Sequence, residues 1–206
     1  MKIKLTNLGK RYNRDWVFRK LEYEFLAPKK YAITGPNGSG KSTLLQIISG
    51  GVFFNEGDIQ YSGKNNKIIA SEKIYRHISL AAPYLELIEE MTLLEFFAFH
   101  QKMKGWLENI TVQQIIGELK LEDAANKQIR YFSSGMKQRV KLAQAIFSNV
   151  PVILLDEPLT NLDDAGIILY HSLISNFCMN KMVIVSSNDP KEYSFCQEEI
   201  DIKLYK

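Results

Sequence analysis

The run from Gly35 to Ser42 holds the clearest chemistry in this sequence. It reads Gly-Pro-Asn-Gly-Ser-Gly-Lys-Ser and matches the phosphate-loop pattern G-x-x-x-x-G-K-[ST], between an apolar run that ends at Thr34 and a segment with helical spacing. Its glycines let backbone N–H groups turn towards phosphate oxygens, and the following helix adds the positive end of its dipole. We expect Lys41 to contact the β- and γ-phosphates, Ser42 to bind Mg²⁺ and Thr43 to contact the α-phosphate. The predicted nucleotide-binding residues of the loop are Gly35, Pro36, Asn37, Gly38, Ser39, Gly40, Lys41, Ser42 and Thr43.

Two adjacent carboxylates, Asp156 and Glu157, follow a second apolar run that begins at Val152. A phosphate loop by itself does not distinguish kinases, GTPases and ATPases. An acidic pair at the end of a buried strand narrows the choice, because Asp156 can hold Mg²⁺ while Glu157 orients or deprotonates the attacking water. We therefore expect Glu157 to be catalytic and Asp156 to share the metal with Ser42.

A third motif spans Phe132 to Arg139 and reads Phe-Ser-Ser-Gly-Met-Lys-Gln-Arg. Here the chain resembles the ATP-binding-cassette (ABC) family of ATPase domains, whose signature Leu-Ser-Gly-Gly-Gln opens a basic helix shortly before the acidic strand. The likeness continues through Pro158 to Thr160-Asn161-Leu162-Asp163, which resembles the D-loop of that family. The resemblance covers essentially the whole chain, and the ordered set of motifs is highly specific.

The resemblance implies a head-to-tail dimer in which two domains sandwich two ATP molecules. Each ATP would lie between the phosphate loop of one domain and the signature of the other, so Asp163 would lie at the subunit interface. In that family an aromatic residue stacks on adenine, and Tyr12 would take this place, with Trp16 and Phe18 as the other candidates. Alternatively, Tyr12 is a strand residue buried in the core. The signature residues expected to act on the partner's ATP are Ser133, Ser134, Gly135 and Met136.

Several positions depart from the family pattern. Ser134 replaces a glycine, where a positive φ would strain serine, and Met136 replaces a glutamine whose amide could donate hydrogen bonds. Pro83 stands where the family has the glutamine of its Q-loop, and Asn188 stands where it has a catalytic histidine. Asparagine can donate a hydrogen bond to the γ-phosphate but cannot become cationic. We expect ATP binding to persist and hydrolysis to be slow.

Composition excludes several classes of protein. The chain has 206 residues, 46% of them hydrophobic and 24% charged, with a formal net charge of +3, which are ordinary values for a globular protein and too weakly basic to predict nucleic-acid binding. No apolar run approaches the roughly 20 residues of a membrane-spanning helix, and residues 1–7 alternate instead of forming a signal peptide. The three histidines show no metal-ligand spacing, and we expect them at surfaces or subdomain edges.

Hydrophobic periodicity places these motifs on an α/β framework. Alternation predicts strands in the first 30 residues and in the tail from 199 to 205. A capping-box pattern opens a predicted helix at Thr92. The aromatic residues of this helix, Phe96, Phe97 and Phe99, are expected in the core more than at an interface. Further segments are a strand at 58–61, helices at 42–49, 111–119 and 136–147, and buried parallel strands at 152–155 and 182–185. The predicted fold is an α/β phosphate-loop NTPase core with a parallel sheet, an antiparallel β-subdomain and an inserted α-helical subdomain. It forms a single domain over 1–206, with core and β-subdomain at about 1–82 and 150–206 and helices at about 83–149.

These features predict an ATP-binding and ATP-hydrolysing subunit that powers a separate membrane permease through ATP-driven dimerisation, with ATP and Mg²⁺ as cofactors. The partners would be a second ABC ATPase domain, identical or different, and the permease, which would face the segment from about 83 to 103, with Leu85 and Leu87 as interface candidates. Such a protein would be cytoplasmic and peripheral on the inner face of the cell membrane. The alternative is a non-transport switch or regulatory module that uses ATP-dependent dimerisation; a small-molecule kinase has no use for the signature.

Overall fold

The computed structural model describes residues 1–206, apart from the side chain of Lys64. The chain divides into two compact units. The first contains residues 1–80, 151–156 and 180–206, and the second contains residues 81–150 and 157–179. The expected helical segment at 83–149 lies within the second unit, which also takes in the residues that follow the acidic strand.

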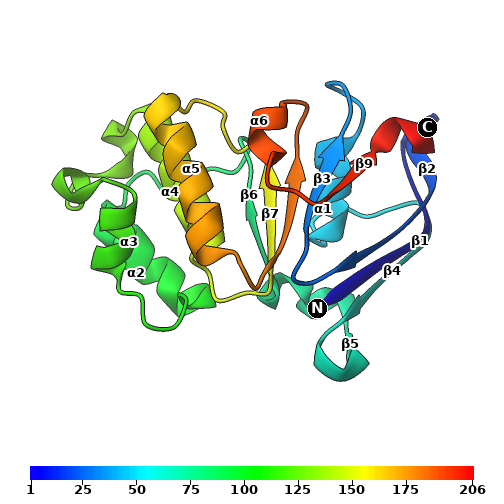
Figure 1. Ribbon diagram of the computed structural model, residues 1–206, viewed down its shortest axis with the longest axis horizontal. Helices are drawn as coiled ribbons and strands as arrows, with labels where there is room; N and C mark the ends of the chain where they lie inside the picture. The colour runs from blue at the N-terminus through cyan, green and yellow to red at the C-terminus, as the bar shows by residue number, and fades with distance from the viewer. The chain divides into compact units, whose positions relative to one another are not determined.

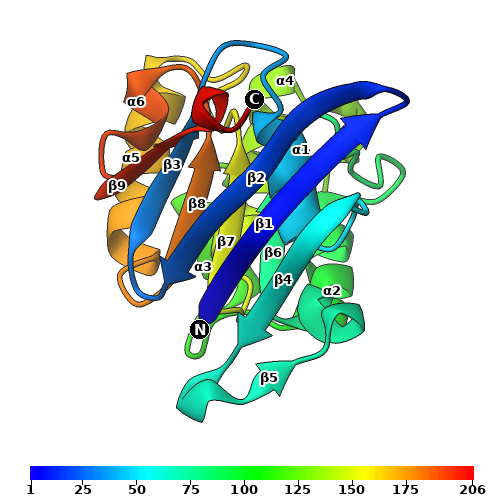
Figure 2. The ribbon, with the colours of Figure 1, turned by 90° about the vertical axis from the view of Figure 1, so that its right-hand side faces the viewer.

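The first unit contains two sheets. A five-stranded sheet has the order β6-β7-β8-β3-β9, in which β3 runs parallel to both β8 and β9, and β7 runs parallel to β8. A four-stranded sheet has the order β2-β1-β4-β5 with antiparallel pairs, and β2, β1 and β4 lie side by side in Figure 2. The strands are β1 Lys2–Tyr12, β2 Asp15–Leu26, β3 Lys30–Thr34, β4 Glu56–Ser62, β5 Ile68–Ile69, β6 Ile78–Ala81, β7 Val152–Asp156, β8 Met182–Ser186 and β9 Glu198–Asp201.

Helix α1, Lys41–Ile48, lies between the two sheets of this unit (Figure 1) and joins them into one core. Its buried residues, such as Leu44 and Ile48, belong to the same apolar cluster as Ile3 of the antiparallel sheet and Ile184 of the parallel sheet. The unit also contains the short helix α6, Pro190–Tyr193. Every residue of β7 and β8 is buried, as expected for strands covered on both faces.

The second unit is helical. It contains α2 Leu93–Lys104, α3 Val112–Glu118, α4 Ser134–Ile146 and α5 Asp164–Phe177, and α4 and α5 run side by side in Figure 1. Both hydrogen bonds of the predicted capping box are present at the start of α2, where Thr92 and Glu95 exchange side-chain and backbone contacts. Among the described residues no helix is both long enough and apolar enough to cross a membrane.

The predicted fold class is confirmed, and four local features differ from the sequence-based expectations. The alternating tail forms β9 only in its first half and then turns into a 3-10 helix, Ile202–Tyr205. Helix α5 was not anticipated, although Asp163 caps it. The prediction that the histidines lie at surfaces or edges was wrong for His100, which is 5% exposed. Phe96 and Phe97 are core residues, as favoured by the sequence, whereas Phe99 is exposed.

Candidate functional site

The phosphate loop connects β3 to α1 within the first unit. Its glycines adopt backbone conformations that other residues rarely reach, with φ of 140° at Gly35, 73° at Gly38 and 104° at Gly40. These left-handed glycines alternate with loop residues whose φ is not positive. Such a backbone lets successive N–H groups converge on one side of the loop, where they form an anion-binding concavity at the start of a helix. This geometry suits the phosphates of a nucleotide.

Gly40 is also required by close packing. A Cβ atom at this position would lie 2.3 Å from Cγ1 of Val17 on β2, at a φ that already disfavours L-residues. At Gly35 an added Cβ would lie 2.8 Å from the Ser39 hydroxyl and 3.0 Å from Ile202. The loop therefore packs closely against β2 and the C-terminal 3-10 helix.

The polar groups of the loop meet the end of β7. The Ser42 hydroxyl donates a hydrogen bond to Oδ1 of Asp156 at 3.0 Å, which joins the two expected metal ligands across 114 residues of sequence. Lys41 is 5% exposed, and its ammonium group donates to the carbonyl oxygens of Gly35 at 2.9 Å and Pro36 at 3.2 Å. Burial raises the pKa of Asp156, while the hydroxyls of Ser186 and Ser42 and the charge of Lys41 act against that shift.

These residues fit a phosphate group and a magnesium ion. The Ser39 hydroxyl is buried and has no hydrogen-bond partner among the described residues, so it is available to a phosphate oxygen. A hydroxyl and a carboxylate at hydrogen-bond distance are the oxygen ligands that Mg²⁺ prefers, with water completing the octahedron. The side chains of Ser42 and Asp156 would hold the ion.

Asn188 follows β8 and lies against the phosphate loop. Its Nδ2 donates to Oδ1 of Asn37 at 3.2 Å, a contact between residues 151 positions apart. The loop around it is held by the Ser187 backbone N–H, which donates to the Ile33 carbonyl at 3.1 Å, and by the Ser187 hydroxyl, which accepts from the Asp189 backbone N–H at 2.9 Å. The amide of Asn188 is therefore presented to the loop by a fixed backbone.

The aromatic candidates for adenine stacking occupy different environments. Phe18 is fully buried in the core, whereas Tyr12 is 51% exposed at the end of β1. The ammonium of Lys10 lies 4.6 Å from the centre of the Tyr12 ring. The Trp16 ring is flanked by the guanidinium groups of Arg11 and Arg19, at 5.5 Å and 4.5 Å. Because half of the Tyr12 surface is exposed, the alternative interpretation of Tyr12 as a core residue is wrong.

The signature lies in the second unit, at the start of α4. The Ser133 hydroxyl accepts a hydrogen bond from the Met136 N–H at 3.2 Å, so it caps the helix and its own hydrogen remains available to a ligand. Ser134 is the first residue of α4 and has ordinary helical backbone, so the strain expected for a positive φ does not arise. A Cβ on Gly135 would lie 3.1 Å from the Asn161 carbonyl oxygen, so a larger residue here would crowd the segment that follows β7.

The residues after the acidic strand complete this half of the site. Glu157 has a φ of 42°, a left-handed conformation that is rare for glutamate, and its carbonyl accepts from the Thr160 N–H at 3.2 Å. Asp163 caps α5 by accepting from the Gly166 N–H at 2.8 Å, and this bond lowers the pKa of Asp163. Sequence reasoning missed the residues of α4 that hold this segment. Gln138 donates to the Pro158 carbonyl at 2.8 Å, and Arg139 approaches Asp163 at 3.4 Å.

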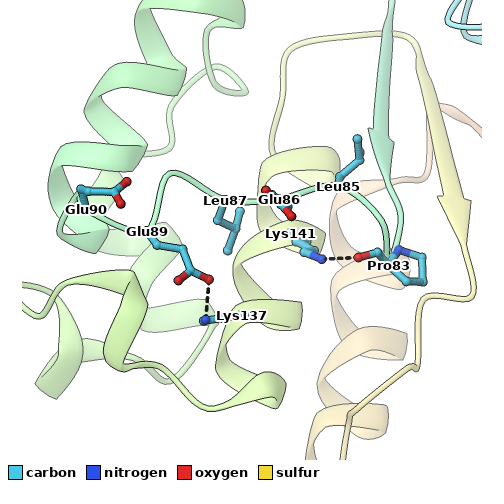
Figure 3. A pocket seen from close by; sticks show the side chains of 8 residues that line it. All are labelled: Pro83, Leu85, Glu86, Leu87, Glu89, Glu90, Lys137 and Lys141. Atoms are coloured by element: carbon cyan, nitrogen blue, oxygen red, sulfur yellow. Dashed lines mark hydrogen bonds and ion pairs between the residues drawn. The ribbon is translucent and has the colours of Figure 1, made fainter.

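Pro83, in place of the expected Q-loop glutamine, lines a groove of about 440 Å³ in the second unit (Figure 3). The Lys141 ammonium donates to the Pro83 carbonyl at 2.8 Å, and Lys137 forms an ion pair with Glu89 at 2.5 Å. The groove is lined by Pro83, Leu85, Glu86, Leu87, Glu89, Glu90, Lys137 and Lys141. Leu85 is 37% exposed and Leu87 only 8%, although both contribute to the lining.

Comparison with known proteins gives concordant results. The sequence profile of a family described as "ABC transporter" matches residues 18–160. A protein of Bacillus subtilis (strain 168) described as the uncharacterized ABC transporter ATP-binding protein YybJ is 31% identical over 196 residues, which cover 92% of this chain and 86% of the relative. The lantibiotic transport ATP-binding protein SrtF of Streptococcus pyogenes is 29% identical over 192 residues, covering 90% and 79%. Among solved structures, the dimeric post-hydrolysis state of the ATP-binding cassette MJ0796 bound to ADP and Pi superposes with a TM-score of 0.81 at 25% identity, covering 95% of this chain and 91% of that one.

Proposed function

Because this chain belongs to the ABC transporter family of ATP-binding proteins, we propose that it binds and hydrolyses ATP to power a separate membrane permease. The observation that carries the proposal is the presence of two complementary half-sites on one chain. The first unit carries the phosphate loop with Ser42 and Asp156, and the second carries the capped start of α4. The two units would act together as the core and helical subdomains of a single nucleotide-binding domain.

In this proposal two copies, or one copy and a related chain, associate head to tail around two ATP molecules. The phosphate loop and Lys41 bind the phosphates, Tyr12 stacks on adenine, and the partner's Ser133 and Gly135 cover the γ-phosphate. Mg²⁺, held by Ser42 and Asp156, would neutralise charge on the phosphates. Glu157 orients and deprotonates the attacking water, and Ser134, Met136 and Asp163 lie in the interface. A dimeric relative bound to ADP and Pi supports this arrangement.

We expect hydrolysis to be slow. The side-chain amide of Asn188 already donates one hydrogen bond to Asn37. Its second N–H could donate to the γ-phosphate, but the amide carries no charge. Charge-assisted hydrogen bonds are roughly twice as strong as neutral ones, so the γ-phosphate would be held less firmly than by a cationic histidine. At Pro83 only a backbone carbonyl is offered, and that carbonyl accepts from Lys141.

The groove of Figure 3 is the place where we expect the permease to dock. It offers an apolar contact at Leu85, and three glutamates, Glu86, Glu89 and Glu90, outnumber its two lysines. One lysine is paired with Glu89, and the Glu90 carboxylate lies 3.7 Å from the Arg130 guanidinium, so the charges around the groove are nearly balanced. A cytosolic segment of the permease with an apolar residue beside polar neighbours would complement it.

The test is a Glu157→Gln variant, which removes the general base while it keeps the shape of the side chain. With ATP and Mg²⁺ we expect a stable dimer by light scattering, and with ADP a monomer. A variant that stays monomeric with ATP would contradict the sandwich. Affinity purification of the wild-type chain from native membranes should also recover a multi-span membrane protein, and Leu85→Asp should abolish that recovery without changing ATP binding.

The second candidate function is an ATP-dependent dimerisation switch that has no permease. The observation that favours it is the absence of a cationic side chain at position 188 and of an amide side chain at position 83. An ATP-dependent dimer that forms normally, turns over slowly and recovers no membrane protein would support this alternative over transport.

A further inference from the structure

Helix α3 ends in a backbone motif that usually requires glycine. The Lys120 N–H donates to the Gly117 carbonyl at 3.0 Å, and the Leu121 N–H donates to the Ile116 carbonyl at 3.2 Å. These two bonds form a Schellman motif, in which the residue after the helix end adopts the left-handed conformation. That residue is Lys120, with a φ of 56°.

The same chain shows the usual solution at the end of α1. There the Gly50 N–H donates to the Ile47 carbonyl and the Gly51 N–H to the Gln46 carbonyl, both in the same pattern, and Gly50 has a φ of 79°. Most other non-glycine residues with positive φ in the described chain are asparagines, which tolerate this conformation. A lysine at such a position is less favourable for folding than a glycine would be, so its presence is better explained by its side chain.

The Lys120 side chain lines the cavity at the signature. This cavity, of about 460 Å³, lies in the second unit and is bounded on one side by Ser133, Gly135 and Met136 at the start of α4. Arg139 of α4 approaches the carbonyl of the preceding residue, Leu119, at 3.5 Å, which places the end of α3 beside that helix. A flexible cationic side chain therefore stands next to the groups expected to cover a γ-phosphate.

The cavity is lined by two cations, Lys120 and Arg139, and by two carboxylates, Asp123 and Asp163. The two cations differ in their availability. The Arg139 guanidinium approaches both the Leu119 carbonyl and the Asp163 carboxylate, and its side chain is only 18% exposed. Lys120 is exposed, and no ion pair or side-chain hydrogen bond of Lys120 is found among the described residues. It is therefore the cation that can reach an anionic ligand without breaking an internal contact.

We propose that Lys120 binds the phosphate end of the ATP held by the partner subunit. This inference rests on the proposed ATP sandwich and adds to it a residue outside the signature. A cation here would offset two neutral substitutions, since the side chain of Met136 cannot donate a hydrogen bond and the side chain of Asn188 cannot carry a charge. The ammonium of Lys120 would act as a point charge on phosphate oxygens, complementary to the N–H groups of α4.

The experiment compares Lys120→Gly and Lys120→Arg in the Glu157→Gln background. Glycine relieves the left-handed backbone, so Tm should rise by roughly 2 °C, while the ATP-dependent dimer should weaken roughly tenfold through the lost charge-assisted contact. Arginine should keep the dimer within about twofold. Lys20→Gly is the matched control, because Lys20 is also an exposed lysine with a φ of 55° but lies on β2 in the first unit. It should leave the dimer affinity unchanged.

Opposite changes in stability and dimer affinity would not arise from a merely structural role. Dimer affinity that is unchanged in Lys120→Gly, or lost equally in Lys120→Arg or in Lys20→Gly, would overturn the inference. So would a fall in the affinity of the monomer for a fluorescent ATP analogue, which would place Lys120 in its own subunit's site. Failure of the Glu157→Gln parent to dimerise with ATP would instead refute the sandwich on which the inference rests.

Discussion

The buried histidine of the helical unit gives a prediction whose size follows from the structure. The His100 Nε2 lies 2.8 Å from the Ser148 hydroxyl, and that hydroxyl donates its hydrogen to the Gln144 carbonyl at 2.5 Å. The Ser148 oxygen is therefore left to accept, so the neutral His100 ring carries its proton on Nε2. The Trp106 ring stacks on His100 with ring centres 4.5 Å apart. A second proton would place a charge in this apolar setting.

Burial lowers the pKa of His100 from 6.5 to about 4, and the nearby charge of Lys104 acts in the same direction. The folded protein thus binds this proton more weakly than the unfolded chain does. The contribution of His100 to stability is complete above about pH 6.5 and is lost progressively as the pH falls towards 4. At about 1.36 kcal/mol for each unit of pKa difference, acidification to pH 4 should remove about 3 kcal/mol of the free energy of unfolding.

The assay is urea unfolding of the wild type and of His100→Gln at intervals from pH 8 to pH 4. Glutamine can donate to Ser148 but does not titrate, so the difference between the two curves isolates the histidine. We expect the free energy of unfolding of the wild type to fall by about 3 kcal/mol more than that of the variant, with the steepest divergence between about pH 6 and 4.5. Parallel curves would refute the reasoning, because they would mean that the folded state accommodates the imidazolium.

Three further predictions concern the nucleotide site. Gly40→Ala places a methyl group 2.3 Å from Val17 Cγ1, so Tm should fall by roughly 5–10 °C. Adding Val17→Ala to this variant should restore part of the loss in Tm, and no recovery would show that the clash is not the cause. Asp156→Asn removes the charge but keeps an acceptor for the Ser42 hydroxyl. Calorimetry should therefore show ATP binding weakened by about tenfold or more in the presence of Mg²⁺ and unchanged in EDTA. An equal loss of affinity in both conditions would contradict a metal role. Asn188→His should raise the turnover rate and give it an inflection near pH 6.5, about the ordinary pKa of histidine, whereas a pH profile like that of the wild type would argue against a role at the γ-phosphate.

Some elements could be predicted directly from the sequence, and the strand before the acidic pair is one of them. The apolar run before Asp156 correctly predicted a buried strand, since its β-branched and aliphatic residues are all covered in β7. The capping box at Thr92 was also predicted correctly, because it depends on two residues only three positions apart. Helix α5 was missed, although a capping Asp163 and apolar residues at 169, 170, 173 and 174 carried the signal.

The sequence alone determined the contiguous motifs, which are the phosphate loop, the signature and the acidic pair. Each of them is built from neighbouring residues, so its backbone geometry is local. The sequence determined the fold class for the same reason, since periods of two and of 3.6 residues are local properties. Only the tertiary structure decided that Ser42 meets Asp156, that Asn188 contacts Asn37 and that Lys120 lines the signature cavity. Such pairs depend on strand order and helix packing, which bring distant segments together without leaving a periodic trace in the chain. The burial of His100 belongs to the same class, because one polar residue on an amphipathic helix does not reveal which neighbour will cover it.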